Sequence, residues 1–222
     1  MCVQEGRAKF QQHFQIGDFH VWTASATADG HHGVEVRFNT RIAFSVSGPA
    51  HADKKLGVDN VNSIFADPRV LLAEVSSSVV DVIVVAAHAP GFWTLHPDPP
   101  HEPVAIRWWR HLAELLLPYR HRPMVMGIDA NLDLFRPPTT GNKLLCFEEF
   151  QRVLSSLGMS LTAIAPGVSA YPAGPPPTFG QPWRESHIDY IAFSAAVDPK
   201  PASARVLTDS TLRTITSASQ PP

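Results

Sequence analysis

The sequence predicts an α/β (α+β) fold: a four-layered sandwich of two mixed β-sheets packed face to face, with helices on the outer faces. Two observations lead to this prediction. Short apolar runs typical of strands outnumber helical patterns, and the helical patterns fall between pairs of strands. The chain has 222 residues, of which 44% are hydrophobic, so it can bury one sizeable core. We therefore expect a single domain.

The first half of the chain alternates short apolar runs with turn signals. A short helix is expected over residues 6–13, and the polar, irregular stretch 50–67 predicts an excursion over the surface. The run at 79–86 is nearly continuous Val and Ile, which is typical of a strand buried on both faces. The strands expected in this half cover residues 1–5, 19–24, 33–38, 42–46, 69–75 and 79–86.

The second half contains the clearest helical pattern, over residues 102–117. Val104, Trp108, Leu112 and Leu115 recur there at helical spacing, which predicts one buried face that includes the aromatic residues. The remaining elements expected are a strand at 124–128, a helix at 147–156 and a strand at 188–193. The chain has 21 prolines, many of them in clusters, and these clusters predict the loops between the ordered segments.

Composition excludes few function classes. The formal net charge is −2, so the chain has no overall positive charge that would by itself indicate a nucleic-acid partner. The charge does not exclude such a partner either. Cys2 and Cys146 have neither metal-ligand spacing nor the pattern of a disulfide framework. The longest apolar run, 79–87, is interrupted by Asp81 and is too short to cross a bilayer. Without a secretory signal, the default expectation is an intracellular protein, with no membrane partner and no oligomer implied.

The segment that organises the chain is the apolar run 125–128, which ends in Asp129 and, two residues later, Asn131. Where a buried strand leads into a loop, polar side chains two residues apart lie on the same side of the extended chain. Asp-x-Asn after a strand is also common turn chemistry, so alone this segment leaves both interpretations open.

Three other fragments occur in a defined order around it. The order is Gln-Glu, then His-x-Pro, then Gly-x-Asp-x-Asn, then Ser-x-Ile-Asp-Tyr-Ile, and the fragments lie at residues 2–5, 87–90, 127–131 and 186–191. This order resembles the endonuclease/exonuclease/phosphatase superfamily, which includes DNase I-like nucleases and the endonuclease domains of non-LTR retroelements. The resemblance runs from Val3 to about Ser194 and implies a DNase I-like fold.

The resemblance implies a role for each matched residue. Glu5 corresponds to a ligand of Mg²⁺ or Mn²⁺, hard cations that need few protein oxygens. Asp129 would position or deprotonate the attacking water, and Asn131 would hold a phosphate oxygen or that water. His88 would contact or protonate the scissile phosphate, and Asp189 would orient a catalytic histidine. Without that resemblance, Glu5 is a solvated surface charge and His88 a histidine hydrogen-bonded at a strand end.

The sequence departs from the family pattern at both ends. Members usually have an Asn-bearing strand before Gln-Glu and a closing Ser-Asp-His strand, and no Asp-His dipeptide occurs in this sequence. We therefore expect one domain over 1–222 that lacks the first and last strands, with 195–222 as a poorly ordered tail. Ile128 replaces the usual glycine, with Gly127 one step earlier, which we expect to stiffen the approach to the metal.

The resulting hypothesis is a metal-dependent phosphodiester hydrolase of nuclease type, with activity reduced or lost because Asp189 lacks its histidine. The alternatives are an inactive fragment of the same fold, or a non-catalytic module that binds a phosphate-containing ligand or a protein. The expected partner is nucleic acid, with DNA favoured over RNA. Inositol phosphates and sphingomyelin stay open as substrates because fold does not fix substrate.

Two other features receive less weight. His31 and His32 could suggest a metal site, but adjacent side chains on a strand point to opposite sides. A basic group around the 102–117 helix could face a phosphate backbone, although a solvated helix face is the simpler interpretation. Its members are Arg107, Arg110, His111, Arg120, His121 and Arg122.

Overall fold

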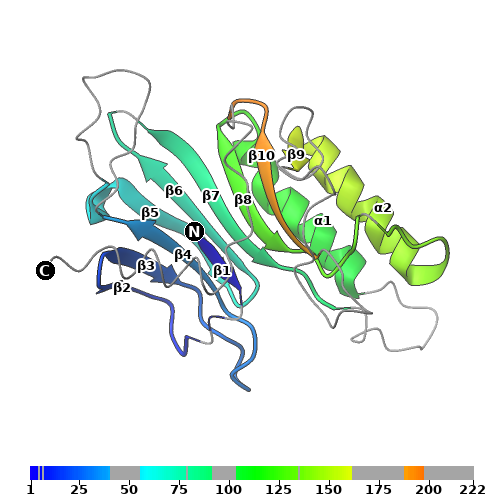
Figure 1. Ribbon diagram of the computed structural model, residues 1–222, viewed down its shortest axis with the longest axis horizontal. Helices are drawn as coiled ribbons and strands as arrows, with labels where there is room; N and C mark the ends of the chain where they lie inside the picture. The colour runs from blue at the N-terminus through cyan, green and yellow to red at the C-terminus, as the bar shows by residue number, and fades with distance from the viewer. Residues whose placement is uncertain are drawn as a thin grey trace, which may run out of the picture.

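The computed structural model describes residues 1–4, 6, 8–40, 56–78, 80–91, 104–134, 136–161 and 188–197. They form a four-stranded and a six-stranded sheet with two α-helices (Figure 1). The smaller sheet is antiparallel throughout, in the order β1-β4-β3-β2. Its strands are β1 (Cys2–Gln4), β2 (Gln12–Ile16), β3 (Phe19–Thr23) and β4 (Val34–Asn39).

The larger sheet is mixed, in the order β5-β6-β7-β8-β10-β9, because β7 and β8 run parallel while the other pairs are antiparallel. Its strands are β5 (Val61–Asp67), β6 (Val70–Ser76), β7 (Asp81–His88), β8 (Met124–Asp129), β9 (Met159–Leu161) and β10 (Asp189–Ser194). The helices are α1 (Val104–Leu116) and α2 (Gly141–Ser156), and two 3-10 turns cover Val58–Asn60 and Leu117–Tyr119.

The strand β6 shows how the layers are built, because successive side chains alternate between two cores. Val70 and Leu72 pack with the helices, whereas Leu71 and Ala73 pack with residues of the four-stranded sheet. Figure 1 shows both helices on the face of the six-stranded sheet that points away from the smaller sheet. The predicted sandwich is confirmed, and in the described part of the chain its helices cover this one outer face.

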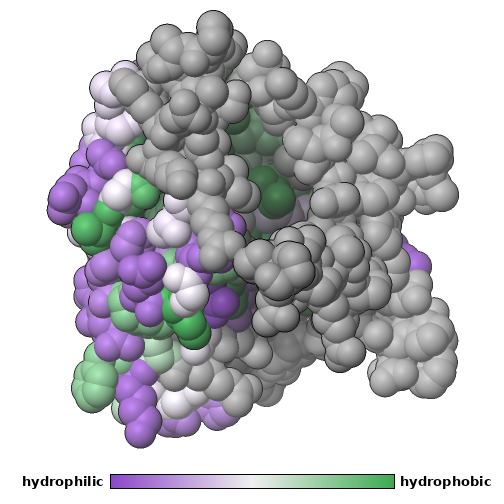
Figure 2. All heavy atoms as spheres, turned by 60° about the vertical axis from the view of Figure 1, so that its left-hand side comes forward, coloured by the Kyte–Doolittle hydropathy of each residue, from purple (hydrophilic) through white to green (hydrophobic). Residues whose placement is uncertain are grey.

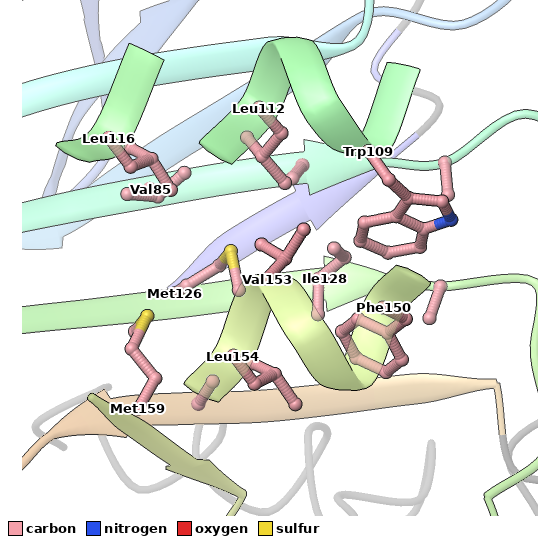
Figure 3. Close-up of a cluster of buried hydrophobic side chains, with 14 of the residues drawn as sticks. Val85, Trp109, Leu112, Leu116, Met126, Ile128, Phe150, Val153, Leu154 and Met159 are labelled. Atoms are coloured by element: carbon pink, nitrogen blue, oxygen red, sulfur yellow. The ribbon is translucent and has the colours of Figure 1, made fainter. Parts of the chain in front are cut away.

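The larger core lies between the helices and the six-stranded sheet (Figure 3). Trp109 of α1 stacks on Phe150 of α2 with ring centroids 4.5 Å apart, and Met126 and Ile128 of β8 face them. The aromatic residues of α1 therefore belong to the core, as predicted.

The predicted buried face of α1 is only partly right: Leu112 is fully buried, and Trp108 and Leu115 are partly buried against the core. The buried positions are Ala105, Ile106, Trp109, Leu112 and Leu116, whereas Val104 is 45% exposed. Two adjacent tryptophans allow two registers of the same periodicity, and packing on α2 selects the one that buries the second.

Two of the predicted elements were wrong and others differ in extent. Residues 6–13 do not form a helix: β2 begins at Gln12 and pairs with β3 in a hairpin. The stretch 50–67 contains β5, whose alternation is disturbed by a bulge between Ser63 and Phe65. The helix expected at 147–156 begins earlier, at Gly141, and β9 was not predicted. The strand expected at 42–46 lies outside the described residues.

The described surface on the side seen in Figure 2 is mainly hydrophilic, with scattered hydrophobic residues. The most exposed large hydrophobic side chains described include Phe10 at 70% and Ile16 at 58%. Across the described ranges, neither helix is long and apolar enough to cross a membrane.

The first strand crosses the larger sheet unusually closely. The Cys2 thiol donates to the Val85 carbonyl at 3.4 Å, and the Gln4 amide donates to the Gly127 carbonyl at 3.3 Å. A Cβ atom on Gly127 would lie 2.6 Å from the Cβ of Cys2. The glycine at 127 is therefore explained by this close approach, a packing reason that the sequence analysis did not anticipate.

Replacing Gly127 by alanine should destabilise the fold by about 1–3 kcal/mol, because β1 must move away from β8. Urea denaturation measures the loss. Gly57→Ala is the matched control, since its added Cβ meets only the Asn60 carboxamide at 3.7 Å. Equal midpoints for the two variants would contradict this account of Gly127.

Candidate active site

Three of the predicted site residues stand in one row across adjacent strands. His88 ends β7, Asp129 ends β8 and Asp189 begins β10, and Asp129 is the register partner of both others. Their chain neighbours Ala87, Ile128 and Tyr190 belong to the core beneath the helices. Because strand side chains alternate, the row lies on the opposite face, toward the four-stranded sheet.

His88 and Asp129 are in side-chain contact. The Nε2 atom of His88 lies 3.6 Å from Oδ2 of Asp129, and the histidine is only 5% exposed. The backbone also joins the two strand ends, since the Ala89 amide donates to the Asp129 carbonyl at 2.8 Å. This places a buried imidazole against a carboxylate, a pair capable of proton transfer.

Asn131 locks the two loops that leave these strands. Its backbone N–H donates to Oδ1 of Asp129 at 2.9 Å, and its side-chain amide donates to the Ala89 carbonyl at 2.8 Å. The residue has a φ of 51°, a left-handed conformation that asparagine tolerates better than most residues. The hydrogen bonds of Asn131 therefore stabilise the turn after β8 and also hold the Asp129 carboxylate beside His88.

Asp189 lies opposite Asp129 and is exposed, while its neighbour Tyr190 points the other way into the core. The Tyr190 hydroxyl donates to the Leu132 carbonyl at 2.9 Å and accepts from the Leu134 amide at 2.8 Å. Burial raises the pKa of Tyr190, so its phenol stays neutral. Tyr190 therefore clamps the loop that follows Asn131.

Sequence reasoning missed Arg69 and its contact with His32. The Arg69 guanidinium donates to the His88 carbonyl at 3.2 Å and to Nε2 of His32 at 2.8 Å. The ring of His32 also packs edge-on against that of His88, with centroids 5.2 Å apart. Burial lowers the pKa of Arg69, and the charges of Asp67 and Asp129 partly offset this. Arg69 is thus a half-buried cation at the rim of the row.

The structure explains why the two adjacent histidines are not a paired metal site. They precede β4 and do not lie on a strand, so the alternation argument did not apply to them. An arginine has no acceptor atom, so Nε2 of His32 uses its lone pair to accept from Arg69. That nitrogen is therefore not available to a metal.

The basic group near α1 is divided among structural contacts. Arg122 pairs with Glu74 and Asp81, and Arg110 lies 3.6 Å from Glu149 of α2. His111 packs edge-on against Phe65. These contacts favour the simpler interpretation of a structural and solvated surface.

Solved structures of other proteins share the fold of this chain. No family model and no curated protein matches the sequence. Among solved structures, an AP endonuclease from Archaeoglobus fulgidus matches with a TM-score of 0.54 and 14% identity, covering 89% of this chain and 78% of that one. The AP endonuclease LMAP from Leishmania major matches with a TM-score of 0.55 and 10% identity, covering 87% and 69%. The chain has the DNase I-like fold of the endonuclease/exonuclease/phosphatase superfamily.

A third structure is similar at a greater distance. The endonuclease domain of TRAS1, a telomere-specific non-LTR retrotransposon, matches with a TM-score of 0.48 and 12% identity, covering 82% of this chain and 69% of that one. The fold is shown by the two AP endonuclease matches, and at identities of 10–14% any activity has to be argued from the site.

The side chains at the row fit a hard divalent cation. Asp129, Asp189 and Asn131 supply oxygen atoms at one sheet edge, and oxygen is the donor that Mg²⁺ prefers. Among the described residues, no three His, Cys, Asp or Glu side chains form a metal cluster. Such a cluster is not required, since Mg²⁺ keeps several waters. Glu5, the predicted ligand, lies outside the described residues, and its neighbour Gln4 is held against β8.

Removing the Tyr190 hydroxyl should loosen the loop after Asn131. At pH 7, Tyr190→Phe leaves the Leu132 carbonyl and Leu134 amide without this partner, which should cost about 1–3 kcal/mol of unfolding free energy. The wild-type protein should also lose stability above about pH 10, where the unfolded chain ionises this tyrosine and the folded chain does not.

Urea denaturation at pH 7 and pH 10.5 tests both effects. Tyr190→Phe should show a smaller loss between the two pH values than wild type, whereas Tyr119→Phe should follow wild type. The same pH dependence in all three proteins would mean that Tyr190 is not the buried neutral group.

Proposed function

We propose that this chain is a metal-dependent phosphodiesterase of nuclease type that acts on nucleic acid, with DNA favoured over RNA. The observation that supports the proposal is the row of His88, Asp129 and Asp189 on three neighbouring strands, tied to Asn131. A buried imidazole, two carboxylates and a carboxamide at one edge are the groups that hydrolysis of a phosphodiester needs.

Each side chain has a role in this proposal. Asp129 orients the attacking water and accepts its proton, and its position is fixed by the Asn131 N–H. His88, 3.6 Å from Asp129, exchanges a proton with the scissile phosphate. Arg69 provides a positive charge for a neighbouring phosphate, using guanidinium N–H groups beyond those that bind His32 and His88.

The proposed cofactor is Mg²⁺ or Mn²⁺, held by Glu5 with help from the carboxylates of the row. When bound, such an ion supplies positive charge to the phosphoryl oxygens. The remaining chemistry falls to the side chains: Asp129 and His88 move protons, and Asn131 keeps their loops together.

The proposed rate is low. Asp189 would orient the histidine of an Asp-His pair. No Asp-His dipeptide occurs in the sequence. General acid-base catalysis by one positioned group is typically worth ~10²–10⁴ in rate. The chain should therefore hydrolyse DNA slower by about that factor than it would with such a histidine.

A second candidate function is phosphate-ligand binding without hydrolysis. It is favoured by the half-buried Arg69 cation together with the missing Asp-His pair. The two candidates differ in one respect that can be measured: both predict that oligonucleotide binding depends on Arg69, but only the first predicts cleavage that depends on Asp129.

Nicking of supercoiled plasmid in Mg²⁺ should be measurable and should be abolished by EDTA. Asp129→Asn should reduce it by about 10²-fold or more, because the amide keeps an oxygen for the Asn131 N–H but loses the charge and the basicity. Asp59→Asn, at an exposed carboxylate, is the matched control and should cleave like wild type. Equal nicking by both variants would exclude Asp129 from the reaction.

Arg69→Met should weaken binding of a short DNA duplex in fluorescence anisotropy and lower the salt slope of the binding constant by about one. Arg107→Met, at an exposed position on α1, should leave affinity and slope unchanged. If wild type binds in this Arg69-dependent way and never cleaves, the non-catalytic function is the correct one. Unchanged binding in Arg69→Met would exclude Arg69 as a phosphate contact.

A further inference from the structure

The β2–β3 hairpin brings two imidazoles together. It belongs to the four-stranded sheet, whereas the candidate active site lies on the six-stranded sheet. Its register pairs His13 with Trp22 and Gln15 with His20, so the two histidines are diagonal neighbours on one face. Gly17, with a φ of 54°, makes the tight turn that sets this register. Nε2 of His13 lies 3.2 Å from Nδ1 of His20.

We propose that His13 and His20 form a two-imidazole site for a late first-row transition metal ion: Zn²⁺, Ni²⁺ or Cu²⁺. Two nitrogens bound to Zn²⁺ at ~2.05 Å with a tetrahedral angle are about 3.3 Å apart, and two cis nitrogens of a square-planar ion about 2.9 Å apart. The observed 3.2 Å lies between these values. An ion could therefore bind between these nitrogens once the rings turn so that both lone pairs face it, with water completing its coordination.

The protonation of the pair suits this chemistry. The present contact is a hydrogen bond that uses one N–H and one lone pair. Binding requires a lone pair on both facing nitrogens, so one ring moves its proton to its other nitrogen and no net charge is lost. His13 is exposed, which gives an ion access.

Trp22 holds both rings in place. Its ring centroid lies 4.4 Å from that of His13 and 5.9 Å from that of His20. Trp22 is itself 7% exposed and packs edge-on against Phe38. A site with fixed rings loses little conformational entropy on binding, so two ligands suffice for measurable affinity.

Metal binding here would also stabilise the edge of the sheet. Strand β2 has β3 as its neighbour and otherwise forms the end of the four-stranded sheet. A metal ion that bridges His13 on β2 to His20 on β3 joins the two strands through their side chains. Because the ion binds the folded hairpin, it should raise the melting temperature and slow amide exchange in β2.

The test titrates Zn²⁺, Ni²⁺ and Cu²⁺ into the metal-free full chain by calorimetry, with tryptophan fluorescence as a second readout for Cu²⁺. We expect one tight equivalent, with Cu²⁺ bound most strongly. His13→Ala and His20→Ala should each weaken it at least tenfold and abolish the rise in melting temperature. His121→Ala, at an exposed histidine elsewhere, should bind like wild type. Excess Mg²⁺ should not compete, since it prefers oxygen ligands.

Imidazole nitrogen NMR with Zn²⁺ locates the ion directly. The expected result is a shift of His13 Nε2 and His20 Nδ1 before any other histidine. His20→Gln provides a second variant if His20→Ala melts lower than wild type in EDTA. Wild-type affinity in His13→Ala, or first shifts at other histidines, would overturn the proposal and leave the contact as a cross-strand hydrogen bond only.

Discussion

The parallel pairing of β7 with β8 is the constraint on which the site depends. Parallel neighbours end at the same sheet edge, so His88 and Asp129 come to lie side by side. The connection between two parallel strands must cross over the sheet, and here it includes α1, which covers the face behind the site. Strand β10 then runs antiparallel to β8 and therefore begins, with Asp189, at that edge.

Strand β1 passes close to β7 and β8 shortly before these strands reach the site. Cys2 lies against the Val85 carbonyl and Gly127, which precede His88 by three residues and Asp129 by two. On that face, β1 covers part of the apolar core. The polar side chains of His88 and Asp129 follow at the ends of β7 and β8. A carboxylate at this boundary keeps contact with solvent, as the 17% exposure of the Asp129 side chain indicates, while its partner His88 is buried. Asp129 is therefore the more solvent-accessible group of the pair.

Much of this framework could be predicted from the sequence, since each motif follows or forms a short apolar strand pattern. The sequence could not predict β2 or β5. Gln12–Ile16 is polar and becomes a strand because the hairpin supplies a partner, and the bulge at Ser63 hides the alternation of β5. The contact between Arg69 and His32 could not be predicted either. Their contact joins segments 37 positions apart, and no local pattern encodes it.

Backbone conformation gives an independent argument for the site. Among the described residues, the non-glycine residues with positive φ are His32 and Asn131, and both touch the strand ends around His88. A left-handed conformation costs roughly 1–2 kcal/mol outside glycine. Hydrogen bonds from Arg69 and to the Ala89 carbonyl hold the two residues in it. Glycine at either position would remove the strain together with the side chain that makes the contact. The strain is therefore tied to these two side chains at this sheet edge, as expected where geometry serves binding or chemistry.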